Sequence, residues 1–214
     1  MDLDAALIDE LRRVHGVHLV IVYGSRARGT HTAESDIDVA GFADVTETTR
    51  DARLWNGLYL DGFVYPTQIA TTEPDPDLLK LCGGRVLLDE RKLAPALFER
   101  LVSLERQGPP VLVETEQRMR RVWARKMLAR IRRGDLEAHY RYHWLLYQLL
   151  EDHFALRGEW YRGPKESFAA LAVTAPAMLA AFERALVPGA SFDAIEALVD
   201  HVTSSGAPTS AVPE

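Results

Sequence analysis

Cysteine is almost absent from this 214-residue sequence, which has Cys82 and no other cysteine. One cysteine cannot form a disulfide within the chain, and it cannot supply the several thiolates of a zinc or iron–sulfur cluster. A small secreted protein stabilised by disulfides is therefore excluded, and we expect a reduced, cytoplasmic environment.

Long hydrophobic runs are also missing. The longest apolar stretches, at 17–23 and 175–182, are much shorter than the roughly 20 residues that cross a bilayer. The segment 1–4 has neither the basic part nor the apolar part of a secretory signal, so we expect no signal and no membrane span. With 47% hydrophobic and 26% charged residues, the composition is that of a globular protein.

An excess of positive charge is absent as well. The chain has 25 basic and 31 acidic side chains, a net charge of −6, which argues against a surface built for nucleic acid. Residues 112–149 nevertheless carry nine basic and four acidic side chains. This basic band is either a solvated helix face or a surface that faces an anionic ligand such as a nucleotide.

The first half of the chain alternates helix and strand patterns, which predicts a domain over residues 1–108 built on a small sheet. Gly108-Pro109-Pro110 marks the clearest boundary, because strand patterns stop after it. We expect helices at 4–14, 78–81 and 93–107 and strands at 17–23, 37–43, 58–65 and 85–88.

The second half has apolar residues at helical spacing and predicts an all-α bundle over residues 113–203. A polar, proline-containing segment at 204–214 is expected to be a flexible tail. The two halves together predict an α+β protein. The expected helices of the bundle are 113–133, 135–156, 165–172, 177–186 and 193–202.

One stretch carries residues suited to phosphate chemistry. The strand expected at 17–23 ends at Gly24, which lets a backbone approach a phosphate, and at Ser25, whose hydroxyl can donate to one. Asp36 and Asp38 follow, and side chains two apart on a strand lie on the same face. Adjacent carboxylates repel unless a cation lies between them, and magnesium prefers such oxygen ligands. Each feature alone is typical of a solvated turn or strand end, but together they favour a magnesium–phosphate site.

The same stretch resembles a family signature. Gly-Ser, ten residues and then Asp-x-Asp, in the contexts Tyr-Gly-Ser-Arg-Ala-Arg-Gly and Glu-Ser-Asp-Ile-Asp-Val, resemble the polymerase-β-like nucleotidyltransferase superfamily, in particular its minimal and antibiotic-modifying members. The resemblance is close over 17–43 and extends in layout over 1–92. It implies a small mixed sheet and the transfer of a nucleoside monophosphate from a magnesium-bound triphosphate, with release of pyrophosphate.

The resemblance also implies a role for each matching residue. Asp36 and Asp38 would bind one or two magnesium ions, and Gly24 and Ser25 would hold the β- and γ-phosphates. The third carboxylate of the family corresponds to Asp61, which would bind the metal at the acceptor hydroxyl and could take its proton.

Asp61 and two arginines after the Gly-Ser pair can each be interpreted in a second way. Asp61-Gly62 could instead form a hairpin turn, which would make Asp61 a turn residue. Arg26 and Arg28 follow the phosphate turn, and each is either a residue that neutralises phosphate charge or a surface arginine.

The C-terminal half is similar in layout to the helical domain of aminoglycoside nucleotidyltransferases. In that domain a lysine at the start of a helix reaches the triphosphate, and Lys165 matches it, with Pro164 well suited to a first helical position. The alternative for Lys165 is a surface lysine. Some members take a general base from this domain, and Glu151 is the candidate for that role here.

These features predict a magnesium-dependent nucleotidyltransferase that uses ATP or another nucleoside triphosphate and modifies a hydroxyl of a small molecule, for example an antibiotic. Two alternatives stay open. One is an antitoxin-like enzyme that binds and adenylylates a partner protein, and the other is a nucleotide-binding module without catalysis. The site could be completed within one chain or across a homodimer.

Overall fold

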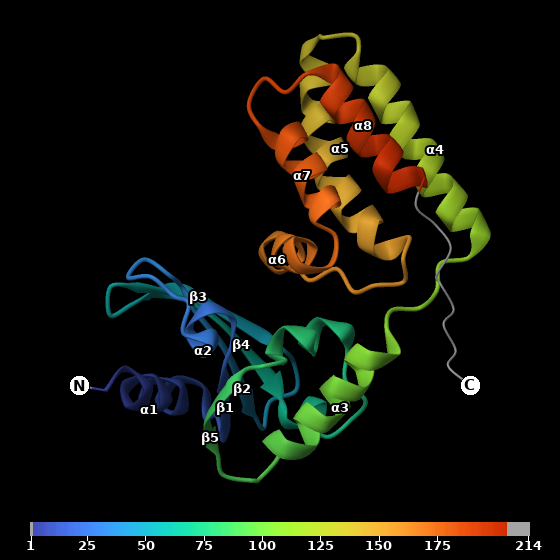
Figure 1. The fold of residues 1–214 in the computed structure, drawn as a ribbon. Coiled ribbons are helices and arrows are strands. Elements are labelled where there is room, and N and C mark those ends of the chain that lie inside the picture. Colours follow the sequence, from blue (N-terminus) through green and yellow to red (C-terminus); the bar gives the residue numbers. More distant parts are fainter. Residues whose placement is uncertain (1, 205–214) are drawn as a thin grey trace. The chain divides into compact units, whose positions relative to one another are not determined.

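The computed structural model describes residues 2–204 and divides the chain into two compact units, Met1–Gln107 and Gly108–Glu214 (Figure 1). Each unit has its own hydrophobic core. The tail predicted at 204–214 lies outside the described residues except for Ser204. Over the described part of the chain, no helix is both long and apolar enough to cross a membrane.

A mixed five-stranded sheet organises the N-terminal unit. Its elements are α1 (Leu3–His15), β1 (Leu19–Val22), α2 (Gly24–Arg28), β2 (Ile37–Ala43), β3 (Thr49–Trp55), β4 (Leu58–Pro66), the 3₁₀ helices η1 (Thr67–Ala70) and η2 (Pro76–Leu81), β5 (Arg85–Asp89) and α3 (Ala94–Gln107). The strand order is β3-β4-β2-β1-β5. β2 and β4 run parallel, whereas the other neighbours are antiparallel.

Different helices cover the two faces of this sheet, because successive side chains of a strand point to opposite faces. On one face, apolar side chains of β1, β2 and β4 pack against Leu7 and Leu11 of α1. On the other face they pack against η2 and against Leu97 and Leu101 of α3. The central strands are therefore buried on both faces over most of their length.

The structure contains a strand that the sequence patterns did not indicate. β3 pairs antiparallel with β4, and the loop between them is Asn56-Gly57. Their φ angles are 51° and 79°, as a two-residue hairpin loop of this kind requires. The alternative hairpin at Asp61-Gly62 is wrong, because both residues lie inside β4.

Helices alone make up the described part of the C-terminal unit. They are α4 (Glu114–Ile131), α5 (Leu136–Ala155), α6 (Pro164–Thr174), α7 (Pro176–Leu186) and α8 (Phe192–Ser204). Leu145, Leu149, Phe182 and Leu198 are completely buried in one shared apolar cluster. The predicted α+β fold class, a small mixed sheet followed by an all-helical region, is confirmed.

Candidate active site

Two carboxylates stand next to each other on the parallel strands at the centre of the sheet. Asp38 of β2 and Asp61 of β4 are register partners, on strands that are roughly 4.8 Å apart. Partners across a parallel pair point to the same face, which farther along the two strands carries Phe42 and Tyr65. The structure therefore brings together two of the residues predicted for the site.

Gly24 lies directly against the Asp38 carboxylate. It is the first residue of α2 and has a φ of +66°. A Cβ atom at this position would overlap Oδ2 of Asp38 and lie 3.1 Å from its Cγ. The segment expected as a Gly-Ser turn is thus a short helix whose glycine leaves room for the carboxylate.

Gly24→Ala is expected to displace Asp38 and to abolish magnesium-dependent nucleotide binding. Gly29→Ala is the matched control, because Gly29 has a similar φ of +70° but no atom within 4 Å of its added Cβ. Both variants should lose about 1 kcal/mol of stability from the left-handed backbone. Thermal unfolding with and without magnesium ATP measures both effects, and equal nucleotide binding by the two variants would contradict the role given to Gly24.

Arg26 holds the loop that carries Asp36. Its Nε donates to the backbone oxygen of Asp36 at 3.0 Å, and its Nη2 donates to that of Ser35 at 2.7 Å. Asp36 directly precedes β2 and is exposed. These two hydrogen bonds favour a structural role for Arg26 over phosphate binding.

The other residues predicted for the phosphate chain also lie on α2. Ser25 is its second residue and is buried, with 6% of its surface exposed. Arg28 is its last residue and is exposed. Both therefore share one short helix with Gly24.

An arginine of the edge strand β3 binds the carboxylate of Asp61. Arg50 donates from Nε to Oδ1 at 2.9 Å and from Nη2 to Oδ2 at 3.1 Å. This bidentate pair raises the pKa of Arg50. A cationic ligand could use Asp61 only by replacing Arg50 or by sharing the carboxylate with it.

A second cation, Lys80 of η2, lies on the same face. Its Nζ is 3.7 Å from the centre of the Phe63 ring and 5.8 Å from the ring centres of Tyr23 and Tyr65. Burial lowers the pKa of Lys80. Burial, together with the negative charge of Asp38, raises the pKa of Tyr23. This face of the sheet thus combines carboxylates, cations and aromatic rings within a small area.

The donor chemistry of the site suits a hard divalent cation. Asp36, Asp38 and Asp61 offer carboxylate oxygens, which magnesium prefers. Within residues 2–204, no group of three or more His, Cys, Asp or Glu side chains is already arranged to hold a metal ion. Because Arg50 binds both oxygens of Asp61, a metal at that carboxylate would have to replace Arg50 or share the oxygens with it.

The residues predicted for the site from the C-terminal unit lie on two helices. Lys165 is exposed and is the second residue of α6, which begins at Pro164. Glu151 of α5 is half-buried and accepts a hydrogen bond from Nε2 of Gln148 at 3.1 Å. Burial, helped by the neighbouring Glu151, raises the pKa of Tyr161 to about 12.

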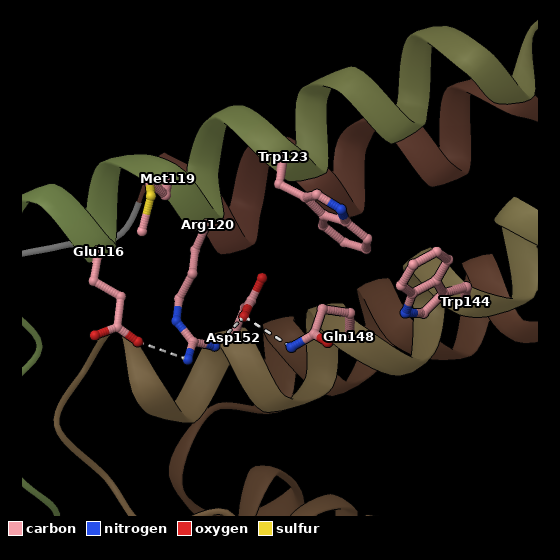
Figure 2. Close-up of a pocket in the computed structure, with 7 residues that line it drawn as sticks. All are labelled: Glu116, Met119, Arg120, Trp123, Trp144, Gln148 and Asp152. Atoms are coloured by element: carbon pink, nitrogen blue, oxygen red, sulfur yellow. Dashed lines mark hydrogen bonds and ion pairs between the residues drawn. The ribbon is translucent and has the colours of Figure 1, made fainter.

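A groove of about 360 Å³ lies between α4 and α5 (Figure 2). At one end, the rings of Trp123 and Trp144 meet edge to face with centres 5.5 Å apart. At the other end, the buried Asp152 accepts hydrogen bonds from Nη1 of Arg120 at 2.7 Å and Nε2 of Gln148 at 3.2 Å. Asp152 is therefore committed to a structural ion pair. The lining residues are Glu116, Met119, Arg120, Trp123, Trp144, Gln148 and Asp152.

Arg50 and Lys80 are the residues of the site that the sequence patterns missed. The loop Asn56-Gly57 was an available signal for Arg50, because a two-residue hairpin loop fixes the β3–β4 register and places Arg50 opposite Phe63. No comparable signal exists for Lys80, whose position depends on how η2 packs on the sheet.

Comparisons with known proteins bear on the N-terminal unit. Residues 5–80 match the family described as the nucleotidyltransferase domain. Among solved structures, the chain is similar to a nucleotidyltransferase-like protein from Exiguobacterium sibiricum, with 14% identity, coverage of 94% of this chain and 73% of that chain, and a TM-score of 0.42. The comparison with curated proteins found no match. The matched segment contains Gly24, Asp36, Asp38 and Asp61.

Proposed function

We propose that the N-terminal unit, whose residues 5–80 match the nucleotidyltransferase domain family, transfers a nucleoside monophosphate, AMP from ATP, to a hydroxyl of a small molecule. The observation that carries this proposal is the register pair of Asp38 and Asp61, with Gly24 packed against Asp38. Two adjacent carboxylates on a half-buried face repel each other; Arg50 offsets part of this cost at Asp61, and a cationic ligand would offset more of it. An antibiotic is one acceptor compatible with this chemistry.

In this reaction the acceptor oxygen attacks the α-phosphorus, the bond from that phosphorus to the bridging oxygen breaks, and pyrophosphate leaves. Asp36, Asp38 and Asp61 would hold magnesium, which when bound offsets the charge of the triphosphate and of the attacking oxygen. Asp61, released from Arg50, would accept the proton of the acceptor hydroxyl. Glu151 is the alternative proton acceptor.

The phosphate chain would be held by residues of α2. Gly24 and Ser25 would bind the β- and γ-phosphates, because the glycine lets the backbone come close to the carboxylates and to a ligand between them. Arg28 would add positive charge, and Lys165 stays the lysine that the resemblance assigns to the triphosphate. Arg26 is left out of this group because its donors already serve backbone oxygens.

The first test is thermal unfolding of the full chain with ATP, GTP, CTP and UTP, each with and without magnesium. A ligand at ~100 times its Kd adds about 2.7 kcal/mol to stability, and for a chain of this size that corresponds to a shift of roughly 5–10 °C. We expect a magnesium-dependent shift that is largest with ATP and that EDTA abolishes.

Pyrophosphate release in the presence of pooled hydroxylated small molecules then tests the transfer itself. Labelling of a copurified protein by [α-³²P]ATP, without labelling of any small molecule, would show that the acceptor is a protein and not a small molecule. A shift with no pyrophosphate release under any condition would indicate a binding module. No shift with any nucleotide would contradict the proposal.

A further inference from the structure

Lys80 has an unusual environment for a lysine. Its ammonium lies over the ring of Phe63, and the ring centres of Tyr23 and Tyr65 are each 5.8 Å away. Within residues 2–204 its three N–H donors reach no hydrogen-bond acceptor, and no carboxylate lies within 4 Å as an ion-pair partner. Lys80 is therefore a partly buried cation whose donors have not been used by the protein.

Packing alone does not account for a lysine at this position. An apolar side chain such as methionine would fill the same space against three rings without placing a charge there. A cation over aromatic faces gains some attraction, but the ammonium keeps its hydrogen-bonding capacity. The arrangement fixes the position of a charge and leaves its donors available to a ligand.

The ammonium of Lys80 can bind an anion, and its charged neighbours indicate where that anion would lie. Lys80 interacts electrostatically with Asp77, Asp61 and Asp38, and the last two lie on the same face of the sheet as its ammonium. Arg50, the other cation on this face, already donates two hydrogen bonds to Asp61. Lys80 is thus a cation near the carboxylate pair with donors to offer an incoming anion.

We propose that Lys80 is a substrate-contacting residue whose ammonium binds an oxygen of the nucleotide's phosphate chain. This inference rests on the proposed nucleotidyl transfer and adds to it a residue that the family signature does not include. A lysine ammonium is a compact charge with three donors, which suits a phosphate chain whose oxygens face several directions. The three rings hold the charge next to the Asp38–Asp61 pair, where the phosphates would lie.

The test compares Lys80→Met with Lys126→Met, which removes an exposed lysine of α4 and serves as the control for total charge. Calorimetric titration with magnesium ATP and with magnesium pyrophosphate measures binding of the phosphate chain with and without a nucleoside. We expect Lys80→Met to weaken both ligands about 10- to 100-fold, as for loss of a hydrogen bond between charged groups. Lys126→Met should bind both as the wild type does.

The outcomes separate this inference from the function on which it rests. If the wild-type protein binds neither ligand, the proposed function fails. If the wild type binds both ligands and Lys80→Met binds them equally well, nucleotidyl transfer stands and the role of Lys80 is overturned. Melting temperature checks the fold of each variant, and Lys80→Gln, which keeps a polar side chain, replaces Lys80→Met if the latter does not fold.

Discussion

Asp38→Asn is expected to lower the rate of the proposed nucleotidyl transfer by at least about 10³-fold and to remove the magnesium-dependent stabilisation by nucleoside triphosphates. The substitution keeps the shape of the side chain and removes the charge that a hard cation requires. Its effect on the unliganded protein should be small, within about 2 °C of the wild-type melting temperature, because Asp38 is half-buried and the amide is nearly isosteric.

Asp9→Asn is the matched control for this experiment, since Asp9 is an exposed carboxylate of α1 on the other side of the sheet. It should keep both the nucleotide-induced shift and pyrophosphate release. Full activity of Asp38→Asn would show that the carboxylate pair is not the reaction centre. A variant that fails to fold would instead indicate a structural role for Asp38.

Arg120→Met is expected to destabilise the helical unit by about 3–5 kcal/mol, the range found when a buried ion pair loses one partner. Arg120 donates to Asp152 at 2.7 Å, and Asp152 is only 2% exposed. Removal of the guanidinium leaves a buried carboxylate with the amide of Gln148 as its remaining partner. Burial of a charge with so little compensation is costly.

The double variant Arg120→Met/Asp152→Leu tests this reason, because replacement of both charges by apolar groups is often neutral. We expect it to recover most of the lost stability. Urea unfolding can be followed by tryptophan fluorescence, since Trp123 and Trp144 line the same groove as the ion pair. A loss below about 1 kcal/mol for Arg120→Met would mean that Asp152 finds water or another donor.

The sequence located the carboxylates because their positions follow from local patterns. Asp36 and Asp38 lie on either side of Ile37, the first residue of an apolar strand, and Asp61 interrupts another apolar run, whose pattern predicts a strand with a hairpin turn as the alternative. Asp38 and Asp61 are neighbours because β2 and β4 pair in parallel, and no local pattern predicts that pairing. Only the resemblance to the family indicates that the two carboxylates belong to one site.

The rest of the site depends on contacts that no local pattern encodes. β3 was missed because its charged residues, among them Arg50 and Arg53, resemble a loop, whereas in the structure they pair with Asp61 and Glu10. The burial of Lys80 depends on two rings of β4 and on Tyr23, which lies between β1 and α2. The roles given to Lys165 and Glu151 stay predictions.

The β3–β4 hairpin limits how far the chain could be shortened without losing part of the proposed site. Segment 17–43 contains every residue of the Gly-Ser and Asp-x-Asp signature. Asp61 and Arg50 lie outside it, on the β3–β4 hairpin, whose loop has two residues and whose strand β4 pairs with β2. The hairpin can form locally, but its parallel docking joins residues far apart in the sequence and is the slower kind of step. The recognisable motif therefore holds only part of the proposed centre, and a peptide or truncated chain that ends before β4 would keep the signature while lacking Asp61.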